Sequence, residues 1–160
     1  MSVVGEELDV DLPPVTPLAG LIGAELNVDL KSLDASSFAA VRTALLEHLV
    51  LVFPNQQLTE ADQVAFAERF GELYLYPHSP GLPDHKDVLP INMPSGTLRG
   101  RWHSDATFDA TPPAISILSA RELPYKRGET AFANPVSYTH LRAHETSLHL
   151  LSRLLVEKKR

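Results

Sequence analysis

The spacing of apolar residues predicts an amphipathic helix early in the chain. Over residues 36–49 apolar positions recur at steps of three and four, and Asp34 or Ser36 is placed to cap the helix. The positions of this apolar stripe are Phe38, Val41, Leu45, Leu46 and Leu49. The continuous apolar run 50–53 follows and predicts a buried strand. The helix is therefore expected to bury one face.

A second helix is predicted to begin after Thr59. The Thr59 hydroxyl is placed to cap it, and Gly71 supplies the left-handed residue that ends it. Its apolar stripe consists of Val64, Ala67 and Phe70. Helical spacing does not continue beyond Gly71, so both predicted helices lie in the first half of the chain.

Outside the helices, short apolar runs separated by proline and glycine predict strands. Residues 15–26 are expected to form one or two small strands with tight turns. Further strands are predicted at 72–76, 88–92, 115–121 and 130–133. Short strands with such turns are typical of a β-sandwich or barrel, so the expected fold class is α+β or mainly β.

The composition is that of one globular domain, with 44% hydrophobic and 21% charged residues among 160. The net charge is -6 and the acids are spread along the chain, so no basic face is available for nucleic acid. No run approaches the roughly 18 to 20 apolar residues that span a bilayer. Residues 1–10 carry acids where a signal peptide carries bases. A cytoplasmic protein without nucleic-acid or membrane partners is therefore expected, with residues 1–14 as a loose lead-in.

Because the chain contains no cysteine, any metal has to be held by His, Asp or Glu. In the segment 102–108, His103 and Asp105 are two residues apart, which places both side chains on one face of an extended strand. Fe(II) accepts such a nitrogen and oxygen pair, and a second histidine from a distant strand would complete a facial triad with open coordination positions. A His-x-Asp pair also occurs by chance, as a polar part of an exposed strand or loop.

Several motifs have the order and spacing found in one enzyme family. They are 102–108 (Trp-His-Ser-Asp-Ala-Thr-Phe), 111–114 (Thr-Pro-Pro-Ala), 122–124 (Glu-Leu-Pro), 128–130 (Gly-Glu-Thr), 22–24 (Ile-Gly-Ala) and 69–73 (Arg-Phe-Gly-Glu-Leu). With these motifs the chain resembles the taurine dioxygenase (TauD/TfdA) family over residues 15–134. One departure is 126–129, Lys-Arg-Gly-Glu, where the family usually has paired glycines before Asp-Thr.

The resemblance implies an Fe(II)- and 2-oxoglutarate-dependent dioxygenase that uses O2 to oxidise a small organic substrate. The implied fold is an incomplete double-stranded β-helix (jelly roll) preceded by the two helices. His103 and Asp105 would be iron ligands, and the Thr130 hydroxyl would bind a carboxylate of 2-oxoglutarate. The family's second iron histidine and its 2-oxoglutarate arginine lie downstream of segment 128–130 and are expected to be missing here. The fragment is therefore expected to show no turnover.

The resemblance also places part of the substrate pocket at Tyr76, Ser79, Arg99 and Ala106. Tyr76 replaces a family histidine, Ser79 a tyrosine and Arg99 an asparagine, so taurine itself is not the expected substrate. Arg99 and Arg101 could attract an acidic substrate, since a guanidinium pairs with a sulfonate, sulfate or carboxylate in a fork geometry. The preferred interpretation of the two is that both are solvated loop arginines.

Residues 136–160 resemble the conceptual translation of a transposase-type sequencing adapter with a lysine-rich poly-A end. We therefore interpret 15–134 as the N-terminal part of a dioxygenase domain and 136–160 as a non-native tail. The alternative is a natural amphipathic helix, because four residues of the tail recur at helical steps. These are Leu141, His144, Leu148 and Leu151. On the adapter interpretation, His140 and His144 do not belong to the iron site, although their spacing suits helical metal ligands.

Two other functions remain open at this point. A non-catalytic binding module on a jelly-roll frame is the main alternative, because fold does not determine function. A metal-dependent hydrolase is less favoured, since His103 and Asp105 without further acids make a poor water-activating site. An Fe(II) titration with 2-oxoglutarate discriminates, because only the dioxygenase is expected to give a visible chelate band. The partner is expected to be a small molecule, and homo-oligomerisation of the full-length protein is open.

Overall fold

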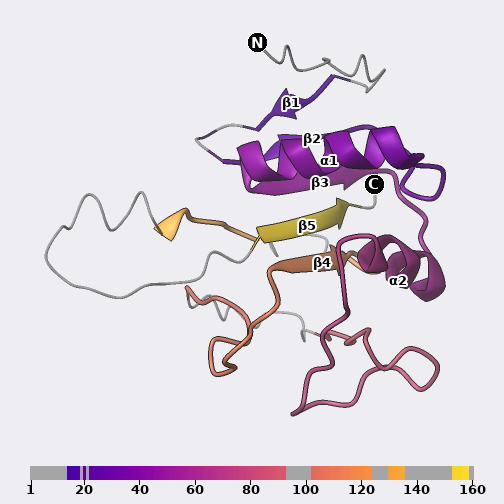
Figure 1. The fold of residues 1–160 in the computed structure, drawn as a ribbon, viewed down its shortest axis with the longest axis vertical. Coiled ribbons are helices and arrows are strands. Elements are labelled where there is room, and N and C mark those ends of the chain that lie inside the picture. The colour runs from indigo at the N-terminus through magenta and orange to yellow at the C-terminus, as the bar shows by residue number, and fades with distance from the viewer. Residues whose placement is uncertain are drawn as a thin grey trace, which may run out of the picture.

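The computed structural model describes residues 14–18, 20, 22–92, 102–123, 130–135 and 153–158. In chain order the elements are β1 (Thr16–Pro17), β2 (Ala24–Glu25), α1 (Ala35–His48), β3 (Val50–Pro54), α2 (Glu60–Glu68), β4 (Ile115–Ser119) and β5 (Arg153–Lys158). The strands of these segments join into one sheet with the order β1-β2-β3-β5-β4 (Figure 1). The described chain thus combines two helices with a small mixed sheet.

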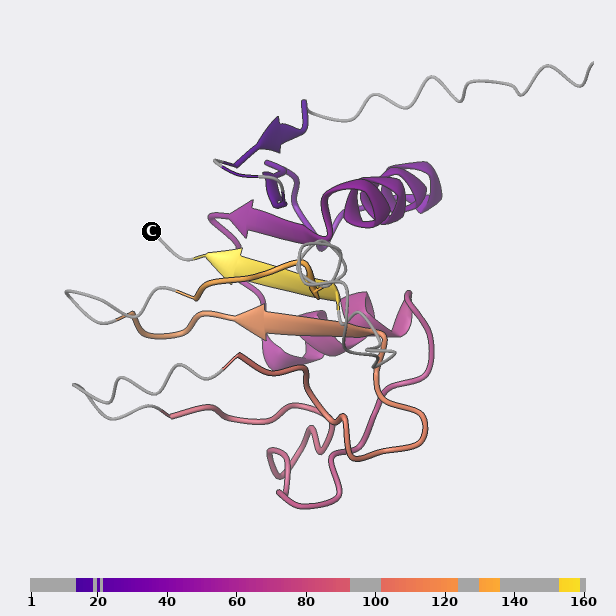
Figure 2. The same cartoon turned by 90° about the vertical axis from the view of Figure 1, so that its left-hand side faces the viewer.

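The sheet places the candidate site at its β4 edge. β1 pairs antiparallel with β2, and the remaining neighbours pair in parallel. Figure 2 shows β3, β5 and β4 side by side with their arrowheads pointing the same way. The segment that follows α2 and the segment that precedes β4 lie together beyond this edge in both views (Figures 1 and 2).

Helix α1 begins at one of the two predicted caps. Asp34 Oδ1 accepts a hydrogen bond of 2.7 Å from the backbone N–H of Ser37, and this bond lowers the pKa of Asp34. The predicted stripe is buried at Phe38, Val41 and Leu45. Leu46 is 54% exposed, so its place in that stripe is wrong. Adjacent helix residues are turned by about 100°, which carries Leu46 off the face where Ala44 is buried instead.

Helix α2 begins at the predicted Thr59. The Thr59 hydroxyl accepts from the Asp62 N–H at 3.1 Å, and Asp62 Oδ2 accepts from the Thr59 N–H at 2.8 Å, which forms a capping box. The helix ends at Glu68, and Gly71 follows with a φ of 144°. Phe66, which the predicted stripe omitted, is the residue of α2 that is buried, at 3% exposure.

Aromatic side chains join the helices to the sheet. The rings of Phe38 from α1 and Phe53 from β3 each lie 6.2 Å from the ring of Phe66, in edge-to-face contacts. Phe70 lies 4.8 Å from Phe38, and the Arg69 guanidinium covers the Phe38 ring at 4.1 Å. Three elements thus share one aromatic cluster, which fixes the position of α2 relative to β3.

One buried amide holds the loop between β2 and α1 against the end of β3. Gln56, only 6% exposed, accepts a hydrogen bond of 3.2 Å from the Leu30 N–H. Its amide nitrogen donates to the carbonyls of Val28 at 2.6 Å and of Pro54 at 3.1 Å. Because every polar atom of this side chain has a partner, its burial is compatible with a stable core.

Strand prediction is confirmed in one part of the chain and wrong in another. Strands predicted within 15–26, 50–53 and 115–121 are confirmed. Strands predicted at 72–76, 88–92 and 130–133 are wrong, because these residues are described and form no strand. A strand exists only when its backbone groups pair with a neighbour, and many side chains of 72–76 and 88–92 line a pocket instead.

Strand β5 belongs to the tail 136–160, of which the structure describes 153–158. Its backbone pairs in parallel with β3 on one side and β4 on the other. The alternative helix over 141–151 lies outside the described residues, as does the lead-in apart from Pro14. No helix in the described segments has the length and apolar character needed to cross a membrane.

Candidate functional site

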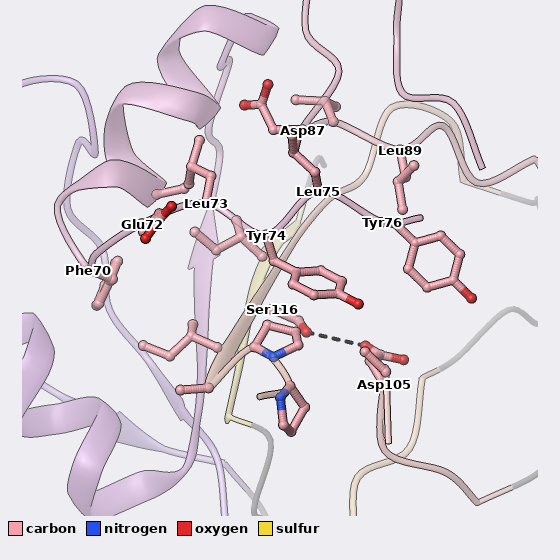
Figure 3. A pocket seen from close by; sticks show the side chains of 18 of the residues that line it. Phe70, Glu72, Leu73, Tyr74, Leu75, Tyr76, Asp87, Leu89, Asp105 and Ser116 are labelled. Carbon is pink, nitrogen blue, oxygen red and sulfur yellow. Dashed lines mark hydrogen bonds between the residues drawn. The ribbon is translucent and has the colours of Figure 1, made fainter. Parts of the chain in front are cut away.

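A pocket of about 1140 Å³ lies beside β4. Its lining comes mainly from segments 70–76, 87–91, 103–108 and 111–118. Figure 3 shows Tyr74, Tyr76, Asp105 and Ser116 among the side chains that line it. The segment predicted to hold a metal therefore forms part of a concave surface.

His103 and Asp105 meet at this pocket. His103 Nε2 lies 3.3 Å from Asp105 Oδ1, and the two side chains are 71% and 54% exposed. The predicted extended strand is wrong, because 102–104 has no regular structure and 105–108 forms a turn. Ala106 has a φ of 50°, a left-handed conformation that cannot continue a strand. The two-residue spacing still brings nitrogen and oxygen together, but in a loop.

The pair fits a single divalent metal. Imidazole and carboxylate ligands lie about 2.0–2.2 Å from such a metal, so two ligands at a right angle are about 3 Å apart. The distance of 3.3 Å between His103 Nε2 and Asp105 Oδ1 is close to this value. Within the described segments no group of three or more His, Asp or Glu could hold a metal. The described residues thus offer one nitrogen ligand and one oxygen ligand.

Strand β4 holds the Asp105 carboxylate. Ser116 Oγ donates a hydrogen bond of 3.2 Å to Asp105 Oδ2 (Figure 3). Ala106, which is 8% exposed, turns the chain immediately afterwards. The Asp109 N–H then donates to the Ala106 carbonyl at 3.0 Å and closes the turn. Asp105 is therefore held both by its own turn and by the sheet.

Asp109 links this turn to Tyr74, which also lines the pocket. The Thr111 N–H donates to Asp109 Oδ1 at 3.2 Å, and the Tyr74 hydroxyl donates to Oδ2 at 2.9 Å. Both bonds lower the pKa of Asp109, and the backbone bond from Thr111 has the larger effect. Desolvation raises the pKa of Tyr74, and its bond to Asp109 adds to this. At neutral pH the pair is therefore a phenol donor and a carboxylate acceptor.

The other predicted site residues occupy different places. Tyr76 and Ala106 line the pocket. Ser79 and Thr130 are exposed and do not belong to its lining. The described residues do not include Arg99, Arg101 or segment 126–129, which departs from the family pattern. The predicted contacts of Thr130 with 2-oxoglutarate and of Arg99 with an acidic group therefore stay predictions.

Three rings form a cluster beside the pocket. The ring centroids of Tyr76 and His78 lie 5.8 Å apart, those of Tyr76 and Phe108 5.9 Å, and those of His78 and Phe108 5.2 Å. Tyr76 and Phe108 line the pocket, and His78 packs against both from outside the lining. The cluster forms an aromatic rim of the pocket that His103 and Asp105 also line.

Sequence reasoning missed Ser116 and Asp109. For Ser116 a signal existed, because side chains alternate along a strand and its neighbours Ile115 and Ile117 pack against the core. Ser116 therefore faces the opposite way, toward Asp105. Asp109 gave no comparable signal, since its partner Tyr74 is 35 residues away and comes from a segment that was expected to be a strand.

The chain matches the sequence profile of the family "Taurine catabolism dioxygenase TauD, TfdA family" over residues 14–154. It is 38% identical over 120 residues to an alkylsulfatase from Acinetobacter baylyi, covering 73% of this chain and 38% of that protein. An alpha-ketoglutarate-dependent sulfate ester dioxygenase from Pseudomonas putida is 36% identical over 137 residues, covering 84% of this chain and 44% of that protein. An (S)-phenoxypropionate/alpha-ketoglutarate-dioxygenase from Delftia acidovorans is 30% identical over 165 residues, covering 91% of this chain and 52% of that protein.

The chain spans 38% to 52% of the length of these three relatives. Alpha-ketoglutarate in two of the names is another term for 2-oxoglutarate. Among solved structures, a taurine dioxygenase from Burkholderia xenovorans is 43% identical, with a TM-score of 0.42 over 46% of this chain and 27% of that chain. The profile match includes His103, Asp105 and the residues that line the pocket.

Proposed function

The chain belongs to the taurine catabolism dioxygenase TauD, TfdA family, and we propose on that basis that it forms the N-terminal part of an Fe(II)- and 2-oxoglutarate-dependent dioxygenase. The observation that carries the proposal is the His103–Asp105 pair, whose donor atoms lie 3.3 Å apart at the pocket. Bound iron, 2-oxoglutarate and O2 supply the chemistry that oxidises a substrate C–H bond.

In this proposal His103 Nε2 and Asp105 Oδ1 hold the iron, and a histidine beyond segment 128–130 completes the facial triad. The Thr130 hydroxyl donates a hydrogen bond to a carboxylate of 2-oxoglutarate. The protein's own task is to fix these donors and to shape the pocket. Tyr76 and Ala106 contribute to that shape, because both line the pocket.

We further propose a small acidic organic substrate. Two relatives are named for sulfate esters and for phenoxypropionate, which each combine an anionic group with a carbon skeleton. The aromatic rim of Tyr76 and Phe108 suits such a skeleton, and Arg99 or Arg101 would pair with the anionic group. Taurine is not assigned, since Tyr76, Ser79 and Arg99 depart from the taurine enzymes.

The proposal includes the extent of the native protein. It assigns residues 15–134 to the first part of a jelly-roll domain in the cytoplasm and 136–160 to translated adapter sequence. Sequencing the native transcript across the codons for Asn134 to Val136 tests this assignment. The expected result is a reading frame that continues into new sequence with a distal histidine and an arginine. A transcript that encodes 136–160 and then stops would contradict it.

The activity itself is tested on the protein encoded by the native transcript. Anaerobic addition of Fe(II) and 2-oxoglutarate is expected to produce a visible charge-transfer band, because both 2-oxoglutarate donors bind the metal at once. His103→Ala and Asp105→Ala should each abolish the band, whereas His85→Ala, outside the pocket lining, should leave it unchanged. A band that survives His103→Ala would contradict the assigned ligands.

A non-catalytic binding module is the second candidate. The observation that favours it is the exposure of His103 and Asp105, at 71% and 54%, which is also expected of incidental polar loop residues. Complete absence of the charge-transfer band in the native protein would support this candidate over the dioxygenase. The 160-residue chain by itself is expected to consume no 2-oxoglutarate, because its described residues offer only two of three iron ligands.

A further inference from the structure

We infer that Ser116 is a positioning residue that determines which oxygen of Asp105 faces the metal. The inference rests on the proposed function, since it requires a metal at His103 and Asp105. Ser116 Oγ donates to Asp105 Oδ2 at 3.2 Å, while Asp105 Oδ1 lies 3.3 Å from His103 Nε2. The two oxygens of one carboxylate therefore have different neighbours and different tasks.

The sheet explains why Ser116 can act in this way. Ile115 and Ile117, its neighbours on β4, pack against the hydrophobic core and hold the strand in place. Because side chains alternate along a strand, the Ser116 hydroxyl projects to the opposite side, where it meets Asp105 (Figure 3). A donor on a strand is better fixed than a donor on a loop. Ser116 thus holds the Asp105 carboxylate, which lies in an exposed turn, in a fixed position relative to β4.

The Ser116 hydroxyl makes the two oxygens of the Asp105 carboxylate distinguishable. Rotation about the last torsion of an aspartate is broad and nearly two-fold, so nothing in the side chain itself distinguishes Oδ1 from Oδ2. A hydrogen bond to Oδ2 breaks this equivalence and leaves Oδ1 beside His103. Serine donates without adding charge, so the carboxylate keeps its negative charge for the metal. Loss of such an outer contact typically weakens metal binding by about 10- to 100-fold.

The test is a titration of the full chain with Mn(II), followed by the loss of the electron paramagnetic resonance signal of free Mn(II). Ser116→Ala is expected to weaken binding by about tenfold or more. Ser116→Thr keeps the hydroxyl and is expected to retain binding close to that of the parent. Thr107→Ala is the matched control, because it removes another pocket hydroxyl from the turn that begins at Asp105.

The outcomes separate this inference from the proposed function. If His103→Ala weakens Mn(II) binding but Ser116→Ala does not, the metal pair stands and the role of Ser116 is overturned. If His103→Ala has no effect, both the metal pair and the role of Ser116 fail. If Ser116→Thr binds as weakly as Ser116→Ala while the amide spectra of both match the parent, the hydroxyl is not what positions Asp105, and the inference is overturned.

Discussion

Residues 22–70, the core region, contain nearly all of the buried apolar side chains, whereas the apolar side chains of residues 71–92 and 102–123, the site region, are partly or largely exposed except at Ala106. Among the residues whose burial the structure describes, which leaves out β5, every buried apolar side chain except Ala106 lies in the core region. In the site region Leu75, Ile91 and Trp102 are 62%, 68% and 74% exposed. The two regions are adjacent in sequence and share a pocket, yet different forces order them.

The core region is ordered by helix caps and by removal of apolar area from water, which act over many contacts at once. In the site region β4 packs against the core through Ile115 and Ile117. Single hydrogen bonds, such as Ser116 to Asp105 and Tyr74 to Asp109, position the loops beside β4. The exposed apolar side chains of the site region remain available for contact with another molecule. A mutation in the core region should therefore change stability, and one in the site region should change binding or local pKa.

The largest expected effect comes from a matched pair of phenylalanines. Phe53→Ala removes a side chain that is 1% exposed and should lower the free energy of unfolding by about 3–5 kcal/mol. Phe108→Ala removes one that is 58% exposed and should lower it by less than about 1 kcal/mol. Urea unfolding of both variants measures the difference. Equal losses would show that the two regions do not differ in the way described.

A smaller loss is expected from the buried amide. Gln56→Ala leaves the Leu30 N–H and the carbonyls of Val28 and Pro54 without their partner, so the free energy of unfolding should fall by about 2–3 kcal/mol. Its exposed neighbour Gln57 provides the control, and Gln57→Ala should change the same quantity by less than about 0.5 kcal/mol. Similar losses of unfolding free energy in the two variants would show that the hydrogen bonds of Gln56 do not stabilise the core.

In the site region the informative variant is Tyr74→Phe. It should cost at most about 1 kcal/mol of stability, because one partly exposed hydrogen bond is lost. The pKa of Asp109 should rise part of the way to its ordinary value, since the larger effect of the Thr111 N–H remains. Carboxyl titration by NMR measures this rise. Tyr76→Phe is the control, and a rise of the same size there would contradict the role of Tyr74.

The smallest effect is a pH dependence at the cap of α2. The bonds from Thr59, together with the Lys31 ammonium 3.1 Å away, lower the pKa of Asp62 from 3.8 to about 2. Because the folded-state pKa is the lower one, Asp62 contributes stability above pH 3.8 that is lost as the pH falls through about 2. Asp62→Asn should therefore be less stable than the parent at neutral pH, and the two should converge below pH 2. Thermal unfolding of both proteins across this pH range measures the difference in their stability. A difference that does not change with pH would contradict the role of Asp62 in the cap.

Prediction from the sequence succeeded where the deciding interaction is local. Asp34 and Thr59 cap their helices through backbone groups three residues away, so the signal lies within a few letters. The same holds for the apolar run of β3. Prediction failed at 72–76 and 88–92, where residues with strand propensity have no strand neighbour in the described chain. Whether such a segment pairs depends on the rest of the fold.

The candidate site likewise contains residues that the sequence could predict and residues that it could not. His103 and Asp105 could be found from their spacing, because a gap of two residues keeps their side chains close in a strand and, as it proves, in this turn. The residues that hold them could not be paired from the sequence alone. Ser116 lies 11 positions from Asp105, and Tyr74 lies 35 positions from Asp109. These contacts exist only after β4 and the segment following α2 have been brought together.

The most direct test of the account is a map of Mn(II)-induced line broadening over the backbone amides and histidine rings of the chain. The account predicts that broadening centres on His103, Asp105 and the adjacent pocket lining, and that the core region is spared except where α2 and Phe70 line the pocket. Broadening that centres on His78 or His85, or that is spread evenly over the exposed acids, would contradict it, because the His103–Asp105 pair would then not be the metal site.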